Sequence, residues 1–589
     1  MPRGPHCQPR GFDKIEGLSD GPFSEAVVVI ASRVGFSLLV LACASSPAAA
    51  SWPADGRAVC TAAVNQSAQV VVADGAGGAL LIWQDIRAGS SYDLYAGHVL
   101  ASGELDGSWP LNGAPVCLAS LNQILPKAIP DGAGGALVVW EDLRGGGPHH
   151  VYAQHVLASG ALDAAWPDSG LQVCADTSGQ RNPVLVSDGG SGLIAAWVDG
   201  RGIYAQHVLG SGLLDGSWPA TGRSLSIYHN SQTLAQVEAD GVGGAIVTWH
   251  DSHVGGSFAV YAARVLSSGI LDSGWPANGR KVSGTDPASL PVLVKDGSGG
   301  VLVAWQDTHV AGAGDVYAQH VLNTGYVDPV WPASGLILTA AANVQIAPTI
   351  ASDGAGGAFV TWQDRRTGTY DIYAAHALSS GANDAAWPVD GLPICTASGD
   401  QRTPNVVADG SGGMITTWDD ARPGSTYDIY AQRVSASATL AFPVDGLALC
   451  QATGNQTGPT LALVSPGLAI VGWGDTRGSN QDIYAMWTAA PNPVAVLPVV
   501  TKALSLAAPY PQPATRSTRF TFQLAGESRA QLAIYNLAGR RVRTWGVAGS
   551  RELTWDLRDE RGATVPAGIY WARLSEDGLS AVRCVAVVP

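Results

Sequence analysis

Apolar and polar positions recur along most of the chain in a unit of about 55 residues. In one such unit, residues 127–129 begin a short strand, and a turn follows at 131–135. Aspartate and glycine in that turn are the residues that tight hairpins use at positive φ. Residues 136–140 are continuously apolar, as in a strand buried on both faces. A strand at 151–156 and a short one ending at Cys174 complete the unit, and no window shows a sustained 3.6-residue period. We therefore predict four short strands per unit and no helix.

Each unit contains the landmark Trp-x-Asp, followed two residues after the aspartate by arginine or histidine. A catalytic residue is normally needed once, in an asymmetric neighbourhood, so eight copies indicate a scaffold. We expect the aspartate to cap its loop through backbone N–H groups and the arginine or histidine to pair with it. The motif residues are Trp83, Asp85, Trp140, Asp142, Trp197, Asp199, Trp249, Asp251, Trp305, Asp307, Trp362, Asp364, Trp418, Asp420, Trp473 and Asp475.

Four strands in about 55 residues is the size of a propeller blade. The repeat region opens at residues 52–60 with a lone copy of the unit's last element, and the eighth unit, which ends near Tyr484, lacks that element. In a ring, the first strand would complete the last blade, whereas an open solenoid would have polar caps. We predict an all-β chain in which residues 51–488 form an eight-bladed β-propeller of four-stranded blades closed by the N-terminal strand.

The units resemble those of bacterial secreted β-propeller repeat proteins. The Asp-Gly hairpin followed by tryptophan is similar to the Asp-box of sialidase-like propellers, and Asp-Ile-Tyr-Ala at 371–374 and 428–431 resembles TolB-type repeats. The spacing from aspartate to tryptophan differs from that of the Asp-box, so sialidase chemistry is not transferred to this chain.

Two further repeat positions contain reactive residue types. Histidine recurs at one of them, with arginine in two copies, and we expect polar tips on the packing between blades: His98, His155, His207, His320 and His376, with Arg264 and Arg433. Cysteine occupies the other, where further copies have serine or threonine, and we expect buried free thiols: Cys60, Cys117, Cys174, Cys395 and Cys450. We expect no catalytic, cofactor-binding or metal-binding residues. One alternative is calcium at the Asp-Gly turns, most of which supply a single carboxylate where calcium takes six to eight oxygens. Another is a metal at His149 and His150, which have no Cys or carboxylate partner nearby in the sequence.

The formal charge of −15 argues against nucleic acid or an anionic membrane as partner, because both need a basic face. Arg33, the apolar run 34–42 and a small-residue stretch ending at Ala50 have the pattern of a signal peptide cleaved after Ala50. The alternative is a lipoprotein box in which Cys43 is lipidated. We interpret the residues before this signal as an extension from a start codon assigned too early. No other segment offers the apolar length of a transmembrane anchor, and we expect a monomer.

The composition changes after the repeats. A Pro-, Ala- and Val-rich linker at 489–508 leads to short alternating strands at regular turns in 509–589, as in a small β-sandwich. This segment resembles the Ig-like C-terminal sorting domain of type IX secretion substrates and the related domain of flagellar hook-capping proteins. The matching positions are Pro509, Pro513, Tyr535, Gly539, Arg540, Trp555, Asp556, Asp559, Gly562, Gly568 and Tyr570.

That resemblance implies export through the secretion machinery to the exterior or the outer-membrane surface of a Gram-negative-type bacterium. Two positions depart from the family pattern: Leu557 replaces the usual glycine, and Arg583 alone remains of a basic final strand. These departures leave open whether the domain is a signal or only a sandwich module.

Three classes of function stay open. We favour a non-enzymatic propeller that binds a glycan or protein, because the repeats are uniform and no unique polar cluster stands out. The alternatives are a secreted sialidase- or glycosidase-like hydrolase with its site at the central channel, and a structural or adhesive spacer. A hydrolase would need non-repeating acidic residues at several blades, and Glu238 is the one acidic outlier at a usually small position.

Overall fold

The computed structural model describes residues 52–588, except 228–231, 253–255, 285–286, 309–313, 423, 425, 489–504, 508, 525–529, 538, 548–551 and 577–578. The expected signal segment, with Cys43 and the cleavage after Ala50, lies outside the described residues. The described residues form strands, numbered β1 to β39, and no helix.

Eight four-stranded antiparallel sheets form the repeat region, and we number them as blades 1 to 8 in chain order. The first strand of each blade is β2 (Gln66–Ala73), β6 (Gln123–Pro130), β10 (Gln180–Ser187), β14 (Gln232–Ala239), β18 (Ala288–Lys295), β22 (Gln345–Ser352), β26 (Gln401–Ala408) and β30 (Gln456–Ser465). The second strand is β3 (Ala79–Asp85), β7 (Ala136–Asp142), β11 (Leu193–Asp199), β15 (Ala245–Asp251), β19 (Val301–Asp307), β23 (Ala358–Asp364), β27 (Met414–Asp420) and β31 (Leu468–Asp475).

The third strand of each blade is β4 (Asp93–Val99), β8 (His150–Val156), β12 (Gly202–Val208), β16 (Ala259–Val265), β20 (Asp315–Val321), β24 (Asp371–Ala377), β28 (Asp428–Val434) and β32 (Asp482–Trp487). The fourth strand is β5 (Ala114–Cys117), β9 (Leu171–Gln172), β13 (Arg223–Ser224), β17 (Arg280–Lys281), β21 (Leu336–Thr339), β25 (Leu392–Cys395), β29 (Leu447–Cys450) and, for blade 8, β1 (Arg57–Cys60).

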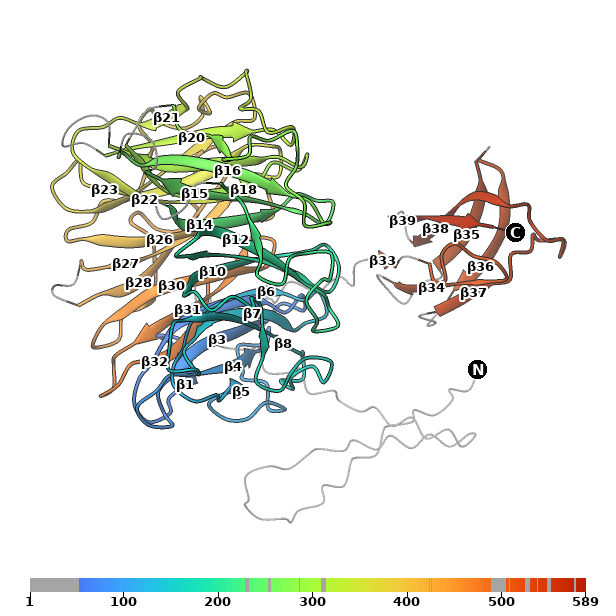
Figure 1. Cartoon of the computed structure of the whole chain (residues 1–589), viewed down its shortest axis with the longest axis horizontal. Helices are drawn as coiled ribbons and strands as arrows, with labels where there is room; N and C mark the ends of the chain where they lie inside the picture. The colour runs from blue at the N-terminus through green and yellow to red at the C-terminus, as the bar shows by residue number, and fades with distance from the viewer. Residues whose placement is uncertain are drawn as a thin grey trace, which may run out of the picture. The chain divides into compact units, whose positions relative to one another are not determined.

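The blades form a closed ring. Each first strand contacts the first strand of the next blade, and β30 contacts β2, so the first strands are the innermost. β1 pairs with β32 in antiparallel register, and Figure 1 shows these two strands side by side although they lie at opposite ends of the repeat region. The predicted eight-bladed propeller, closed by its N-terminal strand, is confirmed.

The second strands hold the core of the ring. The landmark tryptophans are among the largest fully buried side chains, and each hydrophobic cluster joins residues of neighbouring blades. Trp140 stacks on Tyr152 of the third strand with ring centroids 6.1 Å apart. Because such a strand is covered by a blade on each side, its sequence is apolar at every position, which is why alternation is absent there.

Every inner strand begins with the same irregularity. The register between the first two strands shifts after the second residue, and the third residue has a left-handed backbone, with φ of 53° at Leu125 and 50° at Thr403. This is a β-bulge, which bends the strand and leaves its N–H free to bond elsewhere.

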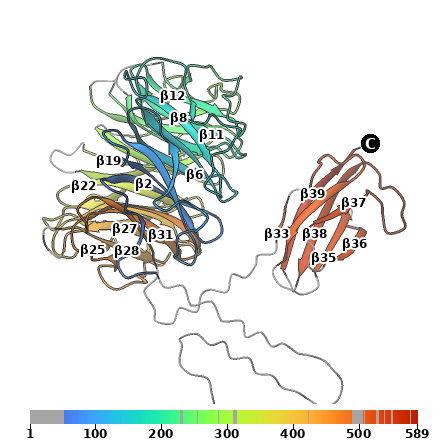
Figure 2. The same ribbon diagram turned by 90° about the horizontal axis from the view of Figure 1, so that it is seen from below.

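Seven strands follow the propeller in a separate pair of sheets, drawn in red in Figure 2: β33 (Ser505–Leu506), β34 (Thr518–Gln523), β35 (Ala530–Asn536), β36 (Arg541–Val547), β37 (Glu552–Trp555), β38 (Gly568–Glu576) and β39 (Leu579–Val587). Their orders are β33-β34-β37 and β36-β35-β38-β39. Both sheets contribute to one core, which includes Phe520, Trp555 and Tyr570. The assignment of this unit as an Ig-like sorting domain stays a prediction.

Candidate functional site

The landmark aspartates are fully engaged within their own blades. In blade 6, the Asp364 carboxylate accepts hydrogen bonds from Trp362 Nε1 at 2.9 Å, the Arg366 backbone N–H at 2.9 Å and the Arg366 guanidinium at 2.6 Å. That guanidinium lies 3.9 Å from the centroid of the Tyr373 ring. The Arg366 Nε group also donates to this carboxylate at 2.9 Å, so all of these donors belong to its own blade and we interpret the motif as structural.

The same motif is present wherever the landmark arginine occurs, with Arg87, Arg144, Arg201, Arg422 and Arg477 paired to the aspartate two residues earlier. In blades 4 and 5, the position is histidine, and both histidines lie outside the described residues. In those two blades the buried indole N–H groups of Trp249 and Trp305 have no hydrogen-bond partner among the described residues.

The repeated cysteines are buried and free, and each thiol lies close to the landmark groups. Cys60 Sγ is 3.1 Å from Arg87 Nη2 and 3.8 Å from Asp85 Oδ2. Burial raises the pKa of Cys60 to about 12, although the nearby Arg87 lowers it. Because the thiolate is the reactive form, this position does not supply a nucleophile.

Each recurring histidine bridges two loops of its own blade, and His98 also packs against Trp109, whose indole N–H donates to the Ala158 carbonyl of the next blade. His98 lies between Asp74, in the β2–β3 turn, and Asp106, in the loop after β4, with both nitrogen–oxygen distances 3.0 Å. Burial lowers the pKa of His98, but the hydrogen bonds to the two carboxylates outweigh it and raise the pKa above its ordinary value. Arg264 in blade 4 contacts Asp240 and Asp272 in the same way.

Non-repeating residues gather at the end of the ring where the inner strands begin, which we call the leading end. In five blades the residue before the third strand is aromatic, and its carbonyl accepts a hydrogen bond from the first residue of the next inner strand, which places these residues at the leading end. The Gln401 N–H, for example, donates to the Tyr370 carbonyl at 2.6 Å. The aromatic residues are Tyr92, His149, Phe258, Tyr370 and Tyr427.

Arg402, the second residue of β26, lies among these rings. Its guanidinium is 5.6 Å from the Tyr370 ring centroid and 5.8 Å from the Tyr427 ring centroid, and it forms an ion pair with Asp400. Asp400 Oδ1 also accepts the Tyr370 backbone N–H at 3.0 Å. The Arg402 side chain is 43 % exposed. We call Tyr370, Asp400, Arg402 and Tyr427 the Arg402 cluster.

A buried carboxyl lies directly opposite Arg402 in the β26–β27 register. Asp419 is 6 % exposed, accepts the Thr403 hydroxyl at 2.6 Å and accepts the Gly458 N–H of the next blade at 2.9 Å. Burial raises the pKa of Asp419 to about 7, against the hydrogen bonds from Thr403 and Gly458 and the charge of Arg402. This carboxyl therefore exchanges a proton near neutral pH.

Asp419 is the residue after the landmark tryptophan of blade 7. The equivalent residue of blade 2 also accepts a hydrogen bond from the next blade. Glu141 in blade 2 accepts the Asn182 N–H of blade 3 at 2.7 Å and contacts His149 Nδ1 at 2.6 Å. Glu141 and Asp419 are not among the candidates predicted from sequence, because the position after the tryptophan is usually polar and an acidic residue there does not stand out. The acidic outlier predicted from sequence is Glu238, whose pKa is raised by burial against the lowering charge of Lys295. The sequence signal for these carboxyls is the middle residue of Trp-x-Asp, which differs from repeat to repeat while the tryptophan and aspartate on either side stay the same.

The residues matched to the sorting domain lie mostly in turns of the C-terminal unit. Trp555 ends β37 and packs edge-on against Tyr570 at 5.5 Å between centroids. Asp559 Oδ1 accepts the N–H groups of Arg561 and Ala563, both at 2.9 Å, which closes the following turn. The remaining positions are Pro509 and Pro513 before β34, Tyr535 in β35, Gly539 and Arg540 in the β35–β36 turn, Asp556 and Gly562 after β37, and Gly568 at the start of β38.

No family model and no curated protein matches this chain. Solved structures do. A protein of unknown function from Dyadobacter fermentans is 10% identical, with 74% of this chain and 99% of that chain covered and a TM-score of 0.35. PorZ, a surface component of the type IX secretion system of Porphyromonas gingivalis, is 10% identical, with 88% and 70% covered and a TM-score of 0.32. A Hadza microbial sialidase is 13% identical, with 57% and 73% covered and a TM-score of 0.32.

Glycoside hydrolases are prominent among these similar structures, and they include an α-L-arabinanase of Penicillium chrysogenum and an α-L-arabinofuranosidase of Fusarium graminearum. The expectation that the chain is not an enzyme is contradicted by this comparison, and we withdraw it. The likenesses themselves, with TM-scores of 0.31 for both enzymes, assign neither an activity nor a substrate to this chain.

Two further observations concern the described residues alone. None of their elements is a helix long and apolar enough to cross a membrane. No group of three or more His, Cys, Asp and Glu side chains among them is arranged to hold a metal ion.

Proposed function

We propose that the protein binds a carbohydrate at the leading end of the propeller, with the Arg402 cluster as the site. The supporting observation is the setting of Arg402. Within the part of the chain that the structure describes, it is the one guanidinium that lies within 6 Å of two aromatic rings. It is also a departure from the repeat, since other inner strands have serine, threonine or isoleucine at this position, and Arg181 is the one other arginine.

This arrangement has the chemistry that sugars need. Aromatic rings offer flat apolar surfaces against which the C–H faces of a pyranose pack, and a few polar groups then fix its orientation. The Arg402 guanidinium donates to hydroxyl or carboxylate oxygens, and Asp400 accepts from hydroxyls. The ion pair with Asp400 limits the side-chain motion of Arg402, so less entropy is lost when a ligand binds.

Hydrolysis of that carbohydrate is the second candidate, and the observation that favours it is Asp419. A general acid works best when its pKa is close to the working pH, and the pKa of this carboxyl is about 7. It lies opposite Arg402 in the strand register, so a sugar held by the Arg402 cluster lies over the strand pair that contains it.

A glycan array with the full chain, followed by titration of each hit, tests the binding proposal. We expect Arg402→Gln and Tyr427→Ala to weaken binding at least about tenfold, since each removes a principal contact. Arg181→Gln is the matched control, because Arg181 is the second residue of β10, is exposed and lies in no such cluster. Failure of the full chain to bind any glycan, or equal loss in the Arg181 variant, would refute the proposal.

The hydrolysis candidate is tested on the same hits by following the release of reducing ends. We expect Asp419→Asn to abolish turnover while the affinity for the glycan stays within about threefold, because the amide keeps the shape of the side chain but supplies no proton. Binding without turnover by the unmodified chain eliminates hydrolysis and leaves the binding proposal intact.

We also propose that the C-terminal unit directs export. This proposal is supported by two glycines of the matched pattern. Gly539 and Gly562 lie in turns with φ of 73° and 82°, a backbone conformation that favours glycine. Fusing residues 505–589 to a periplasmic reporter in a bacterium with a type IX system tests it. Appearance of the reporter outside the cell is expected, and its retention in the periplasm would contradict the proposal.

A further inference from the structure

One buried position of the third strand varies among the blades: it is alanine in blades 4 and 6 (Ala263, Ala375) and methionine in blade 8 (Met486). The residue after Tyr-Ala in the third strand is a fully buried glutamine in four blades: Gln154, Gln206, Gln319 and Gln432. In blade 1 that residue is Gly97, so this is the one blade without a side chain at the position.

The buried glutamine makes the same two hydrogen bonds each time. Gln154 Oε1 accepts the backbone N–H of His155 at 2.9 Å, and Gln154 Nε2 donates to the Pro167 carbonyl at 2.8 Å. Blades 3, 5 and 7 repeat this pattern with distances between 2.8 and 3.0 Å. One carboxamide therefore satisfies one backbone donor and one backbone acceptor at the end of the third strand.

Blade 1 retains the donor and the acceptor without the carboxamide. The His98 carbonyl accepts the Asp106 N–H at 3.0 Å, as the His155 carbonyl accepts the Asp163 N–H at 3.0 Å. In a strand the N–H and C=O of one residue point to the same side. The His98 N–H therefore points toward the loop after the third strand, as the His155 N–H does in blade 2. The Pro110 carbonyl is in the place of the Pro167 carbonyl, since each accepts the N–H of the glycine three residues later.

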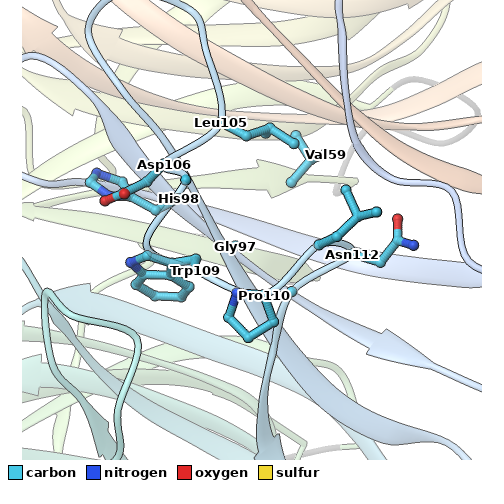
Figure 3. A pocket seen from close by; sticks show the side chains of 11 residues that line it. Val59, Gly97, His98, Leu105, Asp106, Trp109, Pro110 and Asn112 are labelled. Atoms are coloured by element: carbon cyan, nitrogen blue, oxygen red, sulfur yellow. The ribbon is translucent and has the colours of Figure 1, made fainter.

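A cavity of about 360 Å³ lies at this position. Figure 3 shows Gly97 at its centre, with Leu105 and Val59 on one side and Trp109 and Pro110 on the other. Its walls are therefore mainly apolar, and the polar groups of the glutamine pattern lie beside the glycine. Val59 belongs to β1, so the cavity lies between blade 8 and blade 1.

From this geometry we infer that the cavity is a binding site for an acetamido group, such as that of an N-acetylhexosamine. The acetamido oxygen takes the place of glutamine Oε1 and accepts the His98 N–H. Its N–H takes the place of Nε2 and donates to the Pro110 carbonyl, and its methyl group lies over Gly97, where the glutamine side chain would run. This site is distinct from the Arg402 cluster and does not depend on it.

The test uses the full chain and titrates four probes by NMR or calorimetry: N-acetylglucosamine, glucosamine, N-acetylglycinamide and glycinamide. We expect the acetylated member of each pair to bind at least about tenfold more tightly than its free amine, since the amine lacks the carbonyl acceptor. Tighter binding of the sugar assigns the source as glycan, and tighter binding of the acetylated peptide assigns it as protein.

Gly97→Gln introduces the glutamine that four other blades have and fills the cavity, so it should abolish binding. A Cβ at Gly97 would lie 3.1 Å from Val59 Cγ1 and 3.3 Å from the Trp83 ring, which needs a small local shift. Ala375→Gln introduces glutamine at the equivalent position of blade 6, away from this cavity, and should leave binding unchanged. If Gly97→Gln does not fold, Leu105→Trp is the second variant, because a larger side chain at this lining residue also fills the cavity. Binding that is equal for acetylated and free amines, or that persists in the blocked variant, would overturn the inference.

Discussion

At the scale of single residues, the propeller is held by polar groups that the repeat buries eight times. Asp364 shows why substituting these groups should lower the free energy of unfolding. It is fully buried and neutralises the Arg366 guanidinium, which lies against the Tyr373 ring. Removing one partner of a buried pair leaves the other charge uncompensated, which costs far more than the pair contributes as a whole.

Asp364→Ala should therefore lower the free energy of unfolding of the propeller by about 3 to 5 kcal/mol, measured by denaturant titration. Glu104→Ala is the matched control, because Glu104 pairs with Arg57 while its side chain is 62% exposed. Exposed pairs contribute about 0 to 1 kcal/mol, so the control should change little. Equal effects of the two substitutions would show that the landmark aspartate is not a structural centre.

The carboxylate–histidine bridges make stability depend on pH. His98 has a raised pKa, so its contribution is complete below its ordinary pKa of 6.5 and is lost as the pH rises through the folded value. The pKa of Asp74 is lowered, because its hydrogen bonds from His98 and from the Ala76 and Gly78 N–H groups outweigh burial. Its contribution is present above its ordinary pKa of 3.8 and is lost on acidification. The bridge therefore stabilises most between these two values.

His98→Arg tests this dependence with a side chain that the repeat already uses, since Arg264 contacts the two equivalent aspartates in blade 4. Arginine stays charged throughout, so the variant should lose less stability than the unmodified chain between pH 6 and pH 9. Thermal unfolding of both proteins across that range gives the comparison. Parallel curves would show that His98 does not titrate with folding.

At the scale of strands, the sequence pattern predicts the second strand of each blade well and the inner strand less well. The run ending at Trp140 is apolar at every position because it is buried on both faces, and that pattern needs no tertiary information. The bulge in each inner strand leaves no such pattern. Its left-handed residue is leucine, alanine, asparagine, threonine or glycine, depending on the blade, because ladder geometry and not residue type determines the conformation.

The candidate sites follow the same division. Uniform repeat residues can be assigned to the scaffold from sequence, as with Asp364. The Arg402 cluster joins residues from blades 6 and 7 that are brought together only when the Tyr370 carbonyl pairs with the next inner strand. The blade 1 cavity depends on Gly97, which in the sequence is one small residue in a variable position. Both become visible only when the blades are compared at equivalent positions in space.

The left-handed bulge residue gives a prediction for the inner strand. Ala347 has φ of 51°, a conformation that costs a non-glycine residue about 1 to 2 kcal/mol, and blade 8 has Gly458 at the same position. Ala347→Gly should therefore raise the free energy of unfolding by about 0.5 to 1 kcal/mol after the entropy cost of glycine is subtracted. Ala351→Gly, four residues further along β22, should lower it by a similar amount. Chemical denaturation of the two variants measures both free energies of unfolding. An Ala347→Gly variant that is no more stable than the unmodified chain would contradict the proposed strain at Ala347.

At the scale of the whole molecule, blade 8 joins the first and last segments of the propeller. Trp52 stacks on Trp487 with centroids 6.0 Å apart, and Val59 and Cys60 belong to the core cluster around Trp473. Arg477 Nη2 donates to the Asp55 carbonyl at 2.7 Å. Because β1 covers the outer edge of β32 and also contacts β4 of blade 1, its loss affects two blades.

Deleting residues 52–60 should lower the thermal midpoint of the whole propeller by roughly 10 °C or more, since it opens a tryptophan-lined core and an unpaired strand edge. The matched control is a permuted chain in which the same segment follows Trp487 through a short glycine linker, so that the strand is kept and only its connection changes. We expect that chain to unfold as cooperatively as the original, because β1 can again pair with β32. A deletion variant that melts normally would mean that the other seven blades are stable without closure, and the ring would then behave as an open array of blades.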